Sequence, residues 1–192
     1  MRVIALTTLL LSLTLPLPTG TSNADNLVIT GNPEADDCYR ATMLPDSFAA
    51  SAIGSCNTAL NARRISKRDR ASILINRGIL FNHAANYPAA IEDFEAALAL
   101  IPNFPEAYIN RGNTYFYAGN IEKAIADYNR AIKRESPRQH TAYFNRGLAN
   151  ETKKQPDLAF ADFVRAKELK PDWVLATARV ERYLEHGYKT SD

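Results

Sequence analysis

The side chains best suited to chemistry in this sequence are three histidines and two cysteines. His83, His140 and His186 are far apart and do not stand at metal-ligand spacing from any Cys, Asp or Glu. The same spacing argues against a nucleophile paired with a histidine base. No glycine-rich phosphate loop occurs in the sequence. The sequence therefore predicts a protein that is not an enzyme and that uses no metal or cofactor.

Cys38 and Cys56 could form a disulfide, which would close a loop of about 19 residues. On the chain-entropy model, such a bridge stabilises the folded state by roughly 3 kcal/mol. Disulfides persist outside the reducing cytosol, so this pairing depends on where the protein resides. The alternative is a pair of buried thiols that act as small hydrophobic side chains.

The first residues of the chain predict export. A basic start precedes an apolar run over residues 3–17, and a Ser-Asn-Ala sequence that ends at Ala24 fits the preference of signal peptidase. The alternative is an uncleaved anchor, but the run is shorter than the roughly 20 residues of a spanning helix, and Pro16 and Pro18 interrupt its end. We therefore interpret residues 1–24 as a signal peptide. The expected location is the periplasm or the outside of the cell, where the disulfide is favoured.

The rest of the chain is periodic. An Asn-Arg-Gly triplet occurs three times, at intervals of 34 and 35 residues: 76–78, 110–112 and 145–147. An Ala-aromatic-Ala pattern follows each triplet: Ala90, Phe94 and Ala97; Ala124, Tyr128 and Ala131; Ala159, Phe163 and Ala166. A proline closes each unit: Pro102, Pro137 and Pro171. Each unit contains two amphipathic windows of about fourteen residues, so we expect a helical hairpin.

Glycine inside a helix costs about 1 kcal/mol relative to alanine, so three glycines at one phase predict a close approach of another backbone. The alanines of the second helix lie seven residues apart on one face and are the expected partners. One hairpin cannot bury this surface alone, so the units must stack. An extra residue between Ala131 and Pro137 should lengthen a loop.

These repeats resemble the tetratricopeptide repeat family, and the chain is similar to exported bacterial members of it. The resemblance covers residues 71–171 and implies an all-α, right-handed solenoid of helical hairpins with a C-terminal capping helix. The expected segments are the signal peptide (1–24), an N-terminal extension with a degenerate helical hairpin (25–66), three repeat units (71–104, 105–139 and 140–173) and a capping helix (172–187). The apolar side of the capping helix should carry Trp173, Leu175, Val180 and Leu184, and its water-facing side Arg179, Glu181, Arg182 and Glu185.

Charged residues depart from the family pattern in a regular way. An arginine stands where the family usually has leucine, and an aspartate follows sixteen residues later in each unit: Arg77 and Asp93, Arg111 and Asp127, Arg146 and Asp162. We predict that each pair joins the two helices of its unit. The third unit has Asn150 in place of an aromatic residue and Lys154 at its turn, so we expect looser packing there.

The resemblance also implies a binding groove, because first helices of the family line a concave face that receives peptides. By repeat phase, nine residues fall in this groove: Ile75, Asn76, Ile79, Ile109, Asn110, Asn113, Phe144, Asn145 and Leu148. An asparagine amide can both donate to and accept from a peptide backbone. The alternative is that these asparagines bridge neighbouring helices. The expected partner is thus a protein or peptide, held by an adaptor or scaffold of unspecified oligomeric state.

Two other functions remain open: a nucleic-acid-binding helical repeat, and an accessory or inhibitory subunit of a secreted enzyme. Without residues 1–24, the chain has 22 basic and 21 acidic residues, which argues against nucleic acid or membrane surfaces as bulk electrostatic partners. One dense basic stretch, Arg63 to Arg70, is either a solvated linker, which its position favours, or a contact for an acidic partner or an anionic surface.

The signal-peptide interpretation predicts that the protein from the cell envelope begins at Asp25, because cleavage follows the small residue Ala24. Intact-mass measurement and N-terminal sequencing of the purified protein check this. A chain that retains residues 1–24 would contradict it.

Overall fold

A computed structural model of the chain describes residues 33–43 and 49–189. The predicted signal peptide at 1–24 lies outside these residues. The described part contains α-helices and no β-strand, and none of its helices is long and apolar enough to cross a membrane. The helices are α1 (Pro33–Ala41), α2 (Ala49–Leu60), α3 (Lys67–His83), α4 (Tyr87–Leu100), α5 (Pro105–Tyr117), α6 (Ile121–Ile132), α7 (Gln139–Thr152), α8 (Pro156–Leu169) and α9 (Val174–Glu185).

Local sequence determines where several helices begin. Ser66 caps α3, since its Oγ accepts a hydrogen bond from Asp69 N (3.0 Å) and donates one to the Asp69 carboxylate (2.8 Å). Asn86 caps α4 through its side-chain oxygen. Helices α5 and α8 begin with Pro105 and Pro156, whose fixed φ suits the first helical position and which leave no N–H unpaired there.

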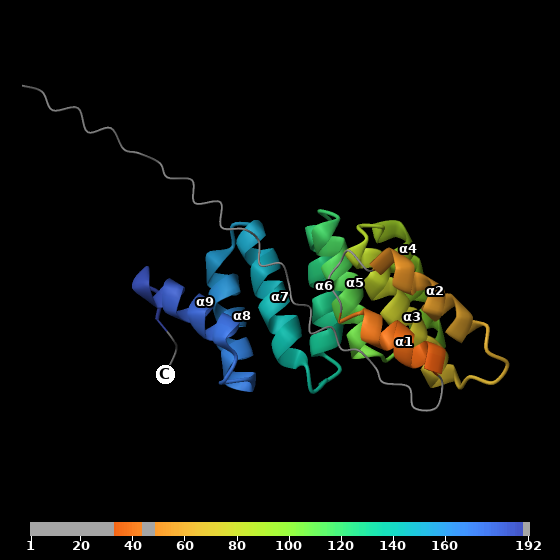
Figure 1. Cartoon of the computed structure of the whole chain (residues 1–192). Coiled ribbons are helices and arrows are strands. Elements are labelled where there is room, and N and C mark those ends of the chain that lie inside the picture. The colour runs from red at the N-terminus through yellow and green to blue at the C-terminus, as the bar shows by residue number, and fades with distance from the viewer. Residues whose placement is uncertain (1–32, 44–48, 190–192) are drawn as a thin grey trace, which may run out of the picture.

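The helices form one row of stacked antiparallel hairpins (Figure 1). The hairpins α3–α4, α5–α6 and α7–α8 are the three repeat units, and α1–α2 forms the expected hairpin ahead of them. Each second helix also packs on the first helix of the next unit, as α4 does on α5. The prediction of an all-α solenoid is therefore confirmed. A disulfide between Cys38 and Cys56 joins α1 to α2 inside a buried apolar cluster.

The three helical glycines have a different partner from the one expected. A Cβ added to Gly112 would lie 2.7 Å from the ring of Tyr128, and Gly78 and Gly147 face Phe94 and Phe163 in the same way. The aromatic ring of the second helix thus lies directly on the glycine. The expected partners, the alanines of the second helix, are all buried but do not make this closest contact. Glycine is required at these positions because the aromatic ring already occupies the space where a Cβ would lie.

The turn inside each hairpin has one backbone conformation in all three units. Ala85, Gly119 and Lys154 stand at equivalent positions and have φ values of 55°, 78° and 56°. This left-handed region costs a non-glycine residue about 1 kcal/mol or more. The additional residue of the second unit lies in the loop after α6, as predicted, and Glu135 in that loop also has a positive φ of 47°.

An ion pair joins the two helices of every unit, as predicted. Arg77 binds Asp93 through Nη2 (2.6 Å), and Arg111 Nε lies 2.7 Å from Asp127. Arg146 Nη2 lies 2.6 Å from the third carboxylate, that of Asp162. The aspartate side chains are almost fully buried, so each needs a charged donor for compensation. Asp127 also accepts a hydrogen bond from Arg130 Nη1 (2.6 Å).

Each of these arginines also reaches back to the preceding hairpin. Arg77 Nη1 donates to Asn57 of α2 (2.6 Å), and Arg111 Nη1 lies 3.6 Å from Glu95 of α4. In the third unit the acceptor is Asn129 of α6, which binds Arg146. One guanidinium therefore connects three helices, namely its own, its partner in the hairpin and the second helix of the unit before.

This series of contacts ends at α9. By repeat phase, Val164 of α8 occupies the position of the acceptors Glu95 and Asn129, and Val180 of α9 occupies that of the arginines. Val180 is buried and belongs to an apolar cluster that Val164 packs against. An apolar contact thus replaces the polar one where the described row of hairpins finishes.

The expectation of looser packing in the third unit is wrong. Asn150, which replaces an aromatic residue, is buried and donates through Nδ2 to Asp162 (3.0 Å). This bond gives the buried carboxylate a second donor beside Arg146, so a polar contact compensates for the missing ring. Lys154 adopts the same turn conformation as Ala85 and Gly119 in the other units.

Helix α9 caps the row with a face that differs in part from the one predicted. Val180 is buried as expected, whereas Leu175 and Leu184, which were expected to point inward, are exposed. Ala176 and Tyr183 are buried in their place. The aromatic ring of Tyr183 packs on the rings of α8, and the apolar periodicity of the sequence missed this because tyrosine was not counted among the core residues.

The ion-pair series predicts that Asp127→Asn lowers the free energy of unfolding by about 3 kcal/mol, because the change removes the buried carboxylate that Arg111 binds. Chemical denaturation of the two proteins measures the difference. Asp172→Asn, at an exposed carboxylate, is the matched control and should be near neutral. Equal stability of Asp127→Asn and the unaltered protein would contradict the assigned role.

Candidate functional site

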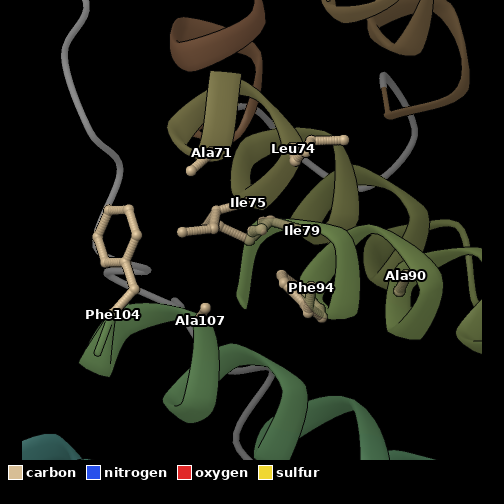
Figure 2. Packing of buried hydrophobic residues seen from close by; sticks show 9 residues of the cluster. Ala71, Leu74, Ile75, Ile79, Ala90, Phe94, Phe104 and Ala107 are labelled. Atoms are coloured by element: carbon tan, nitrogen blue, oxygen red, sulfur yellow. The ribbon is translucent and has the colours of Figure 1, made fainter. Parts of the chain in front are cut away.

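The structure divides the nine predicted groove residues into two groups. Six are buried: Ile75, Asn76, Ile79, Ile109, Asn110 and Phe144. Ile75 and Ile79 belong to a cluster that includes Phe94, Phe104 and Ala107, as Figure 2 shows. The three partly exposed residues are Asn113, Asn145 and Leu148. The accessible part of the predicted groove is therefore the part formed by α5 and α7.

The recurring asparagines do not share one environment. Asn76 is fully buried, and neither its Nδ2 nor its Oδ1 has a hydrogen-bond partner. Asn110 Nδ2 donates to the Glu106 carbonyl one turn earlier in its own helix (2.9 Å). Asn145 Nδ2 donates across the unit boundary to Asn113 Oδ1 (2.7 Å). Of the three, Asn145 is the one that bridges neighbouring first helices.

Tyr128 completes a small polar cluster with this asparagine pair. Its hydroxyl donates to Asn113 Oδ1 (2.9 Å), so that one oxygen accepts from two donors. The ring of Tyr128 is buried on Gly112, and burial raises the pKa of its hydroxyl well above the usual value, with smaller contributions from Tyr117 and Asp127. The hydroxyl therefore stays protonated and orients the Asn113 amide.

This arrangement leaves one donor and one acceptor of the asparagine pair available. Among the described residues, neither Asn113 Nδ2 nor Asn145 Oδ1 has a hydrogen-bond partner. Both side chains are partly exposed and are fixed by their mutual bond. A donor and an acceptor on neighbouring side chains are the groups that the C=O and N–H of a peptide backbone require.

Apolar and aromatic side chains flank the asparagine pair. Phe116 and Tyr117 follow Asn113 by three and four residues on α5, hence on the same helical face. Their rings make an edge-to-face contact with centroids 5.9 Å apart, and Tyr117 is 47% exposed. Leu148 stands three residues after Asn145 on α7. The surroundings of the asparagine pair are therefore apolar and aromatic.

A charged cluster closes the end of α7, and the sequence analysis missed it. Glu151 accepts hydrogen bonds from Arg179 Nη1 (2.9 Å) and Arg182 Nη2 (2.5 Å). It also accepts one from the Tyr183 hydroxyl (3.1 Å). Arg179 and Arg182 were expected to face water, yet they anchor α9 to α7. No pattern at repeat spacing signals this cluster, because the repeat units have no arginine at the positions equivalent to Arg179 and Arg182.

The site has no evident inorganic component. Within residues 33–43 and 49–189, no group of three or more His, Cys, Asp or Glu side chains could hold a metal ion. His140 packs edge-to-face on Trp173 with ring centroids 5.2 Å apart. Burial, followed by the charge of Lys170, lowers the pKa of His140 below its usual value. This residue acts in packing between the third unit and the capping segment.

Comparison with known proteins agrees with this architecture. Two family models match the chain: one described as tetratricopeptide repeat over residues 109–172, and one described as TPR repeat over residues 86–117. No curated protein sequence matches the chain closely enough to count as a relative.

Several solved structures share the fold. The TPR domain of Arabidopsis OM64 is 21% identical, with a TM-score of 0.58, over 63% of this chain and 99% of that domain. The crystal structure of MamA is 20% identical, with a TM-score of 0.62, over 79% of this chain and 83% of that one. The second TPR domain of human RPAP3, in complex with the HSP70 peptide SGPTIEEVD, is 23% identical, with a TM-score of 0.56, over 61% of this chain and 97% of that one.

The stacked hairpins define a helical-repeat solenoid with a partly exposed polar and aromatic face. The family matches at 86–172 and the shared fold specify the class further. The chain is a tetratricopeptide repeat protein.

The Glu151 cluster predicts how stability depends on alkaline pH. Burial, with a further contribution from Glu151, raises the pKa of Tyr183 from 10.0 to about 12. Because the pKa is raised in the folded state, the stability that this environment contributes is fully present below about pH 10. It is lost as the pH rises towards 12. The protein should therefore be more stable than Tyr183→Phe near pH 8, by about 1 kcal/mol for the lost hydrogen bond.

This difference in unfolding free energy should shrink as the pH rises above about 10. The Tyr183 hydroxyl then loses its proton in the unfolded state, whereas Tyr183→Phe has no such proton to lose. Denaturant unfolding of both proteins across this range measures it. A difference that stays constant with pH would contradict the assigned environment of Tyr183.

Proposed function

We propose that this protein is an exported interaction module, an adaptor or scaffold, that binds an extended peptide or protein segment along the face formed by α5 and α7. The fold supports this proposal, since domains of the same architecture include one determined with a bound peptide.

The observation that carries the proposal is the asparagine pair. Asn113 and Asn145 come from neighbouring units, hold each other at 2.7 Å and leave a donor and an acceptor without partners in the described part of the chain. A fixed pair of this kind costs little conformational entropy when it engages a backbone, which favours binding. The pair thus suits recognition of main chain, and the flanking residues suit recognition of side chains.

The same face would suit an accessory subunit of a secreted enzyme, since a segment of that enzyme could occupy it. Phe116, Tyr117 and Leu148 provide an apolar margin next to the asparagine pair. We expect the bound segment to carry at least one apolar or aromatic side chain beside its two backbone contacts. Export remains part of the proposal on the strength of residues 1–24, and the disulfide of α1 with α2 is consistent with it.

A peptide selected from a displayed random library should bind the protein, and Asn145→Ala should weaken that binding by roughly tenfold, because one backbone hydrogen bond and the positioning of Asn113 are lost. Titration calorimetry with the selected peptide gives both affinities. The thermal midpoints of the two proteins are compared first, so that a loss of folding is not taken for a loss of contact.

Asn61→Ala is the matched control. Asn61 is exposed in the segment after α2, and its side chain makes no described hydrogen bond. This variant should bind as well as the unaltered protein. Equal weakening by both substitutions, or none by Asn145→Ala, would place the peptide elsewhere on the molecule.

A further inference from the structure

The segments that connect one hairpin to the next lie along a single edge of the row, because every hairpin starts and ends on that side. Figure 1 shows these connections along its lower side, opposite the turns within the hairpins. We name this the connecting edge, and define it as residues 61–70, 101–106, 133–139 and 167–175.

Basic residues are concentrated on the connecting edge. Segment 61–70 contains five basic residues and one acidic residue, and segment 133–139 contains three and one. Segment 101–106 has one acidic and no basic residue, and segment 167–175 has two of each, so the edge as a whole has ten basic and five acidic residues. On the opposite edge, segments 116–123 and 151–157 each contain equal numbers of the two kinds. The near-even total charge of the chain therefore conceals a strongly uneven distribution.

Several of these cations have no charge partner. Arg63, Arg64 and Lys67 are exposed, and within the described residues they take part in no salt bridge or side-chain hydrogen bond. Lys67 stands in the first turn of α3, where the helix dipole disfavours a positive charge. These residues thus add repulsion without stabilising the fold, which favours a role in binding an anionic partner.

Contacts join three of the four segments of the edge. The Arg68 guanidinium lies over the ring of Phe104, 5.7 Å from its centroid, which connects 61–70 to 101–106. Next to Phe104, Asn103 accepts a hydrogen bond from Arg134 Nε (3.2 Å), which connects 101–106 to 133–139. The Arg134 guanidinium also lies over the ring of Tyr108, 4.5 Å from its centroid. Arg68 and Arg134 are therefore held in place along the edge.

The far end of the same edge exposes aliphatic side chains. Leu169 ends α8, and Val174 and Leu175 begin α9. Val174 is 76% exposed and Leu175 is 46% exposed. A row of cations that leads to protruding aliphatic residues combines the two features that hold proteins on membrane surfaces, namely attraction to anionic headgroups and shallow burial of apolar groups.

We propose that the connecting edge docks on an anionic membrane surface, with Arg63, Arg64 and Lys67 at the headgroups and Val174 and Leu175 at the level of the acyl boundary. The edge suits a lipid surface better than an acidic peptide, because a peptide would use the charges and leave the aliphatic residues in water. It suits nucleic acid poorly, because its aromatic rings pack against protein: Phe104 is buried, Tyr108 lies under guanidinium groups, and Trp173 contacts Phe144.

Sedimentation with lipid vesicles tests the proposal. The protein is expressed from its full sequence and purified after export, then mixed with vesicles of phosphatidylglycerol and phosphatidylcholine in equal parts, or of phosphatidylcholine alone. It should bind the anionic vesicles, with an affinity that falls as salt is added. The triple variant Arg63→Gln, Arg64→Gln, Lys67→Gln should bind about 100-fold more weakly at low ionic strength.

A second triple variant on the opposite edge, Lys123→Gln, Lys153→Gln, Lys154→Gln, removes the same charge and should keep most of the binding. Val174→Ser with Leu175→Ser should weaken binding to anionic vesicles at high salt, where the charges are screened. Equal loss in the two triple variants, equal binding to both kinds of vesicle, or binding to polyglutamate or single-stranded RNA without binding to anionic vesicles would each overturn the proposal.

Discussion

A buried carboxylate that needs a guanidinium is the constraint on which this solenoid depends. Because Asp127 has no access to water, Arg111 must stay within hydrogen-bonding distance, and this fixes the separation of α5 and α6. The same arginine reaches Glu95 of the preceding hairpin, so the contact that holds a unit together also sets its position against its neighbour. Ring-on-glycine packing then fills the space that the ion pairs define, and the face formed by α5 and α7 follows from that spacing.

Much of this fold can be predicted from sequence, because repetition makes weak signals strong. The triplets and alanines locate the hairpins, and the spacing of sixteen residues locates the ion pairs. The sequence does not reveal whether an alanine or an aromatic residue of the second helix lies on the glycine, since both recur at the same spacing. Asn150 also misleads, because its hydrogen bond to Asp162 depends on a geometry that periodicity does not contain.

The candidate site is less predictable than the fold. Phase in the repeat assigns Asn76, Asn110 and Asn145 to one role, yet the structure gives them three environments that range from complete burial to a bridge between units. The same position in the repeat gives a side chain the same direction on its helix. It does not determine which neighbouring residues cover that side chain. The Glu151 cluster joins the third unit to α9 and does not recur in the other units. Total charge similarly hides how the cations of the connecting edge are distributed.

The valines that replace the polar contact at the end of the row limit how the chain can evolve by duplication. A copy of the second unit placed ahead of the third would bring its own arginine and its own acceptor, so both new boundaries would be chemically complete. A copy added after α8 would set an arginine against Val164, which offers it no oxygen. Insertion within the array is therefore compatible with its chemistry, whereas extension beyond α8 would require at least one further substitution.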